Sequence, residues 1–128
     1  MKKAMIIVGC IVGVFVIIIG SGLLYITSGL KTGENLGINA VDLTQIQDGT
    51  YPGSYEGGRW TNAVAVTVSD KKITQINVVK TVNLDNPEVT DTIIKAVIEK
   101  QNTTVDTVSG ATVTSKAYLK SIENALIK

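Results

Sequence analysis

The sequence predicts an α+β fold, namely a small antiparallel sheet with two helices, preceded by a single N-terminal transmembrane helix. Three observations lead to this prediction. An uncharged apolar run fills residues 4–26, residues 62–69 alternate between two faces as a half-buried strand does, and two later segments carry apolar residues at helical spacings. We expect an anchor at residues 1–30, a linker at 31–47 and a domain at 48–128.

The N-terminal run is long enough to cross a bilayer. At about 1.5 Å per residue in a helix, residues 4–26 span a hydrocarbon core of roughly 30 Å. Lys2 and Lys3 precede the run, and the positive charge of Lys31 after it is soon offset by an acidic residue. The positive-inside rule therefore predicts a cytoplasmic N-terminus and an extracytoplasmic domain at the cell membrane.

Three alternatives to a retained anchor are open at this stage. A cleaved signal peptide would use the small residues 20–22, although the apolar run continues past them. A lipoprotein signal would use Cys10, but the apolar stretch before it is short. A pilin-like assembly helix would carry an acidic residue early in the run, where none occurs. We favour a retained anchor in which Cys10 is a small apolar residue that faces lipid.

Residues 31–47 are polar and contain glycine, with no sustained period, so we predict a tether that holds the domain off the bilayer. Residues 40–43, near its end, are the part that could pack on the domain. The domain begins at a turn signal, Asp48 followed by glycine. Residues 50–56 are predicted as an edge or bulged strand, because a proline and a glycine interrupt them.

The central hairpin has the most regular pattern. Residues 62–69 alternate valines with alanines and a threonine, which indicates a strand with one buried face. Residues 69–72 form the predicted connection to a partner strand at 73–79. Ile73 and Ile76 break strict alternation in that strand, which predicts a bulge.

Two helices complete the predicted domain. The first begins at Asn86, a capping residue followed by Pro87 at the first helical position, and it ends at residues 101–104. The second runs over residues 114–127, with Thr114 as its expected cap. Between the helices we expect a short strand at residues 105–108.

Composition narrows the classes of function. The net charge is +1 and no basic stripe occurs, which argues against a nucleic-acid partner. The chain has no histidine, so it lacks the commonest general base and metal ligand. The single Cys10 excludes an intrachain disulfide and a cysteine cluster for a metal. We expect no metal site and no catalytic residue, and a borrowed cofactor fits this composition best.

The segment at residues 106–112, Asp-Thr-Val-Ser-Gly-Ala-Thr, organises the domain. Gly110 lets a ligand approach the main chain, Ala111 adds almost no bulk, and Thr112 presents a hydroxyl. A helix start offers unpaired N–H groups and a partial positive charge, which suit a phosphate. These residues predict a phosphate-bearing ligand, with Thr112 as the candidate attachment point. Ordinary capping and turn chemistry is the alternative for this segment alone.

The pattern Asp-x-x-Ser-Gly-Ala-Thr resembles the attachment motif of the FMN-binding domain family. Residues 48–51 resemble the opening of that domain, and residues 101–117 resemble the run through the motif into its last helix. The resemblance implies FMN joined by a phosphoester to Thr112, installed by a flavin transferase that uses FAD as donor. Some members carry a Gly-Leu-Gly-like loop before the preceding helix, and residues 82–86 depart from it.

The resemblance gives the other motif residues supporting roles. Ser109, Gly110 and Ala111 are expected to shape the turn beside the phosphate. Asp106 is expected to hold the turn by accepting backbone N–H bonds, or to help the transferase recognise the site.

The flavin ring needs flat or apolar walls. Tyr51, Tyr55 and Trp60 lie in one short segment and are the candidates for ring contact, although aromatic residues of an edge strand can equally cover a small core. Arg59 is a candidate partner for flavin phosphate or oxygen atoms, and Lys116 is a weaker one.

The sequence therefore predicts a membrane-anchored extracytoplasmic flavoprotein with covalent FMN on Thr112. It would transfer electrons between membrane or extracytoplasmic redox partners, since related domains occur in membrane NADH:quinone and ferredoxin-linked complexes. A carrier or redox subunit is favoured over a stand-alone enzyme, because no substrate pocket is identifiable. The alternative from another class is a non-redox sensor or envelope-interaction module on the same anchor.

Overall fold

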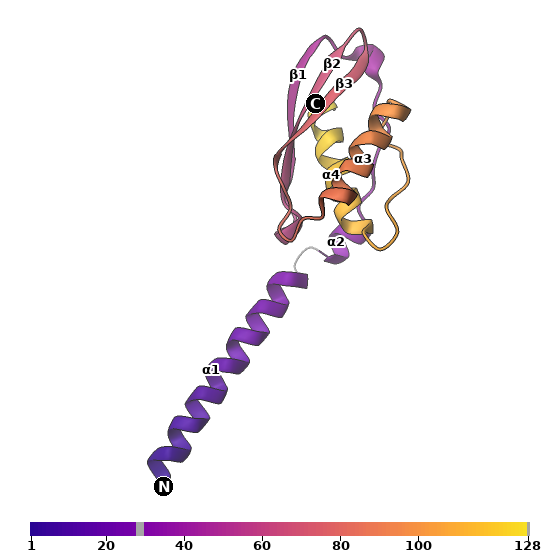
Figure 1. Cartoon of the computed structure of the whole chain (residues 1–128). Helices are drawn as coiled ribbons and strands as arrows, with labels where there is room; N and C mark the ends of the chain where they lie inside the picture. Colours follow the sequence, from indigo (N-terminus) through magenta and orange to yellow (C-terminus); the bar gives the residue numbers. More distant parts are fainter. Residues whose placement is uncertain (28–29, 128) are drawn as a thin grey trace.

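The computed structural model describes residues 1–27 and 30–127. Figure 1 shows a long N-terminal helix that leads to a three-stranded sheet with helices packed against it. The elements are α1 (Lys2–Thr27), α2 (Leu30–Glu34), η1 (Leu43–Gln45), β1 (Gly49–Tyr55), η2 (Gly58–Trp60), β2 (Asn62–Ser69), β3 (Lys72–Lys80), α3 (Pro87–Lys100) and α4 (Thr112–Leu126). This architecture confirms the predicted α+β class with its N-terminal helix, and adds the short helix α2.

The first helix, α1, is long and apolar enough to cross a membrane. None of its residues is buried, and it projects away from the sheet in Figure 1. An exposed apolar helix of this length is stable in hydrocarbon and unfavourable in water, which supports the predicted membrane anchor.

The sheet is antiparallel, with the order β1-β2-β3. β1 is an edge strand, as predicted, and it stays paired with β2 along its whole length through Pro52 and Gly53. An edge position tolerates proline because one side of the strand needs no ladder partner. The β2–β3 connection has Asp70 and Lys71 at positive φ, 51° and 61°, as a two-residue type I′ hairpin requires.

The predicted bulge in β3 is confirmed. Thr67 pairs with Gln75 and Val68 pairs with Ile73, so β3 carries one extra residue between the two pairs. The extra residue resets the alternation, and as a result Ile73 and Ile76 are both buried.

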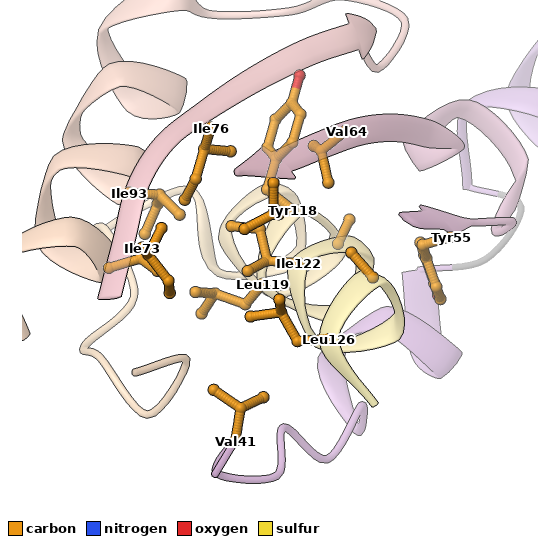
Figure 2. Close-up of a cluster of buried hydrophobic side chains, with 14 of the residues drawn as sticks. Val41, Tyr55, Val64, Ile73, Ile76, Ile93, Tyr118, Leu119, Ile122 and Leu126 are labelled. Atoms are coloured by element: carbon orange, nitrogen blue, oxygen red, sulfur yellow. The ribbon is translucent and has the colours of Figure 1, made fainter. Parts of the chain in front are cut away.

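The core lies between the sheet and α4. Figure 2 shows side chains from β2 and β3 meeting those of α4, with Ile93 of α3 beside them. The backbone of β1 also lies directly on α4, because a Cβ atom added to Gly53 would collide with the carbonyl oxygen of Ser121 and the amide of Ala125. Gly53 therefore sets the distance between the edge strand and the last helix.

The start of α3 is as predicted. Asn86 is its N-cap, and the side chain accepts a hydrogen bond from Glu88 N at 3.1 Å, with Pro87 at the first helical position. The helix ends at Gln101, whose φ of 57° is left-handed. The Gln101 side chain then bonds both backbone groups of Ile73, at 2.6 and 2.9 Å, and joins the end of α3 to β3.

The loop before α3 is held by α4. The Tyr118 hydroxyl accepts from Val82 N at 3.2 Å and donates to Asp85 Oδ1 at 3.0 Å. Burial raises the pKa of the Tyr118 phenol, so the hydroxyl keeps its proton and remains a donor. The loop at residues 82–86 is therefore fixed to α4 by a side chain.

Residues 40–43 pack on the domain as predicted, whereas the prediction of a tether is wrong for much of the rest of residues 31–47, which also packs on the domain. Val41 is buried, the Thr103 hydroxyl donates to Asn39 O at 2.6 Å, and Lys116 Nζ donates to Glu34 O at 2.7 Å. Leu36, Ile38, Leu43 and Ile46 pack against the core at irregular spacings, and side-chain bonds to the backbone add to this packing. The lack of periodicity in residues 31–47 therefore did not indicate a segment detached from the domain.

The structure also corrects the approach to α4. Residues 105–108 form no strand, and α4 begins at Thr112, two residues earlier than predicted. Ala111 rather than Thr114 is the N-cap, and no side chain makes a capping hydrogen bond there. The motif therefore reaches the helix through a turn alone.

Candidate functional site

A tight turn delivers the chain into α4. Ala111 N donates to Val108 O at 2.9 Å, and Gly110 has a φ of 79°. A type II turn requires positive φ at its third residue, which is the place of Gly110. A Cβ atom at Gly110 would meet nothing within 4 Å, so the backbone conformation, not crowding, favours glycine here.

Ser115 holds this turn from inside α4. It is fully buried, its hydroxyl donates to Ala111 O at 2.7 Å, and its oxygen accepts from Val108 N at 3.1 Å. One hydroxyl thus ties together the first and last residues of the turn. Sequence reasoning missed this role, although a serine four residues after a helix cap can bond that carbonyl.

Thr112 is exposed at the first position of α4. The first N–H groups of a helix have no intrahelical acceptor, and within the described ranges no side chain caps those of residues 112–114. These donors and the helix dipole favour an anion beside the Thr112 hydroxyl.

A cavity of about 310 Å³ opens beside this helix start. Its walls come from three parts of the chain: Leu30 and Glu34 of α2, Arg59 and Trp60 of η2, and residues 110–114. Its volume is at the lower end of the range for small-molecule sites. The α2 wall was missed because that segment was predicted to be a tether.

The wall formed by η2 supplies a cation and a ring. The Arg59 guanidinium carbon lies 4.0 Å from the centre of the Trp60 ring, and Trp60 is only 2% exposed. Arg59 Nε donates to Ile26 O at 3.1 Å, while its two Nη groups have no acceptor in residues 1–27 and 30–127. A guanidinium with free Nη groups is well suited to a phosphate.

The structure separates the three aromatic candidates. Trp60 lines the cavity with Thr112, whereas Tyr51 lines another cavity of about 470 Å³ with Leu126 and Ile127, at the opposite end of α4. The Tyr51 hydroxyl donates to Gln47 O at 2.6 Å. Tyr55 is buried in the core, and its hydroxyl has no hydrogen-bond partner among the described residues. Trp60 is therefore the candidate that the fold brings to Thr112.

Asp106 and Lys116 also lie differently from the expectation. Asp106 is exposed beside Glu99 and Lys100, and no hydrogen bond joins it to the turn within the described part of the chain. Ser115 makes the bonds to the turn that were expected of Asp106. A role of Asp106 in recognition by a transferase stays a prediction. Lys116 is engaged with the carbonyl of Glu34 and holds α2 in place.

Comparison with known proteins bears on this site. The sequence profile of the family described as FMN-binding domain matches residues 58–127, which is more than half of the chain. The match includes η2, the turn and the whole of α4, and thus two walls of the cavity. No curated protein matches the chain.

Proposed function

The chain belongs to the FMN-binding domain family and so is a flavin-binding protein, and we propose that it carries FMN as a phosphoester on Thr112 and transfers electrons. In this proposal α1 is a retained anchor in the cell membrane, with the domain on the extracytoplasmic side. Lys2 and Lys3 before the apolar run support this orientation.

One observation carries the attachment site. Thr112 presents an exposed hydroxyl at an uncapped helix start that lines the 310 Å³ cavity. The N–H groups of that helix start and the guanidinium of Arg59 would hold a phosphate, and the flavin ring would lie against the cavity wall in which Arg59 covers the buried Trp60 ring. The residues present therefore fit FMN.

The chain's own residues account for positioning but not for the attachment chemistry. Ser115 and Gly110 hold the turn in a fixed conformation, so little ordering is needed when the ligand is in place. A threonine hydroxyl is a weak nucleophile without a base, and the chain has no histidine. We therefore propose maturation by a flavin transferase: the Thr112 oxygen bonds to the FMN phosphorus of FAD, and AMP leaves with the hydroxyl proton.

Bound FMN would supply two-electron acceptance and one-electron release. The small cavity and the absence of an identified catalytic group among the described residues support a carrier or redox subunit rather than a stand-alone enzyme. Its partners would be a membrane or extracytoplasmic donor and acceptor.

The attachment is tested by mass. We expect full-length protein made together with a flavin transferase to gain the mass of FMN less one water, and to keep flavin absorbance after denaturation. Thr112→Ala should abolish both signals, because the esterified oxygen is gone. Thr114→Ala, which removes the next hydroxyl of the same cavity, should leave them unchanged. Colourless wild-type protein of unmodified mass would refute the proposal and favour the non-redox sensor or envelope-interaction module.

A further inference from the structure

We infer that Arg59 joins the phosphate on Thr112 to the C-terminal end of α1, so that loading with FMN fixes the domain on its membrane helix. This inference rests on the proposed function and extends it from attachment to a coupling between cofactor and anchor. It depends on three features: the end of α1, the free groups of Arg59 and the shared cavity.

The end of α1 is held by the domain through two side chains. Arg59 Nε donates to Ile26 O at 3.1 Å, and the Asn83 amide donates to the Tyr25 hydroxyl. Ile26 is the last residue but one in the described part of α1, and Arg59 supplies a donor to its carbonyl. A cation at the C-terminal end of a helix is also favoured by the helix dipole. Arg59 is therefore a suitable cap for the membrane helix.

The same side chain faces the cofactor site. Arg59 is the chain's single arginine, and it lines the cavity together with Thr112. Its stacking on the buried Trp60 ring restricts the plane of the guanidinium. Because Nε is used by Ile26, both Nη groups are left for an anion. Arginine binds phosphate through two such donors at once, so one residue can serve both the anchor and the phosphate.

The coupling follows from the ordering of this side chain. A long arginine side chain loses rotamer freedom when it is held in one geometry. A phosphodiester on Thr112 would hold the Nη groups of Arg59. The bond from Nε to Ile26 O would then form with a smaller further loss of rotamer freedom in the Arg59 side chain. By linkage, a domain held on α1 would in turn favour the bound position of the phosphate. Without FMN the domain should sample more orientations relative to α1.

Pulsed electron paramagnetic resonance on full-length protein in phosphatidylcholine nanodiscs can measure this coupling. One spin label goes on the native Cys10 of α1 and the other on Lys95→Cys, a position on α3 whose side chain is 78% exposed. We expect a narrower distance distribution for protein loaded with oxidised FMN than for protein made without the transferase. Mass spectrometry of each sample reports its FMN content.

Two variants of Arg59 and one control variant identify the residue responsible. Arg59→Gln should lose the narrowing in loaded protein, and Arg59→Lys, which keeps the charge without the fork of donors, should restore only part of it. Lys72→Gln removes the same charge at the hairpin, about 23 Å along the strand from η2, and should keep the narrow distribution.

The outcomes separate this inference from the proposed function. Equal widths with and without FMN, in samples whose mass places FMN on Thr112, would overturn the coupling and leave the attachment intact. A distribution that is already narrow without FMN and is broadened by Arg59→Gln would show that the bond from Arg59 to Ile26 O holds the domain on α1 without a phosphate, and would also overturn the coupling. An absence of FMN from the transferase-treated wild type would instead refute the proposed function.

Discussion

Ser115 shows how a single buried hydroxyl can hold a ligand site in place. It bonds both ends of the turn that precedes Thr112, with Val108 N and Ala111 O as its partners. Both are backbone groups of half-buried residues, while the Ser115 side chain itself is fully buried. Their loss would affect the fold and the site together, because no other described side chain bonds this turn.

We expect Ser115→Ala to lower the free energy of unfolding by about 1–3 kcal/mol, because it leaves the amide of Val108 without its partner. The same variant should accept less FMN from the transferase, since the turn is no longer fixed. Urea denaturation and mass spectrometry measure the two effects. Ser69→Ala is the control, because Ser69 is an exposed serine at the end of β2, outside the turn and the cavity. An unchanged midpoint and full loading of Ser115→Ala would contradict this role.

At the scale of single residues, the sequence was informative where chemistry is local. Gly110 and Thr112 could be identified from the motif, and the positive φ of Gly110 agrees with its expected part in the turn. The roles of Arg59 and Ser115 depend on partners that are distant or are backbone atoms, such as the carbonyl of Ile26. The bond of Arg59 to Ile26 joins positions 33 apart, and no sequence pattern reports it. The four-residue spacing of Ser115 from Ala111 is a local signal, but it does not show that the same hydroxyl also accepts from Val108 N.

At the scale of elements, sequence periodicity correctly predicted the strands and helices that bury an apolar face. The alternation in β2 and the capping residue of α3 were both interpreted correctly, since burial and capping act over a few neighbouring positions. The prediction of a tether at residues 31–47 was wrong because irregularly spaced apolar residues pack on the core, and because side chains elsewhere bond the backbone of the segment, as Thr103 bonds Asn39 O. The expected strand at residues 105–108 failed because a turn tied by a side chain replaces the ladder.

The packing of β1 on α4 gives a prediction at this scale. Gly53→Ala should lower the free energy of unfolding by about 1–3 kcal/mol, because the added Cβ would push the strand off the backbone of Ser121 and Ala125. Urea denaturation of the full chain in detergent measures the change. Gly37→Ala is the matched control, since a Cβ there meets nothing within 4 Å. Equal stability of the two variants would show that β1 and α4 can move apart freely.

At the scale of the whole molecule, the cavity exists only because distant parts of the chain meet. α2 precedes the sheet, η2 lies between two strands, and α4 comes near the end of the chain, yet all three supply its walls. Lys116 of α4 donates to the carbonyl of Glu34 and holds α2 against α4. Arg59 of η2 donates to the carbonyl of Ile26 and holds α1 near η2. The candidate site therefore lies at the end of the domain that meets α1, a position that the motif alone could not reveal.

Trp60 makes this arrangement measurable, because it is the chain's single tryptophan and lies in the cavity wall. A flavin on Thr112 would lie within the same 310 Å³ cavity, close enough to quench the indole emission strongly. We expect protein loaded with FMN to show weak tryptophan fluorescence, and transferase-treated Thr112→Ala to keep the full emission of unloaded protein. Denaturing the loaded protein should restore the emission even though the ester survives, because the ring then leaves the cavity wall. If loaded and unloaded native proteins emitted equally, the ring would have to lie outside this cavity, and the walls provided by α2 and η2 would have no part in holding it.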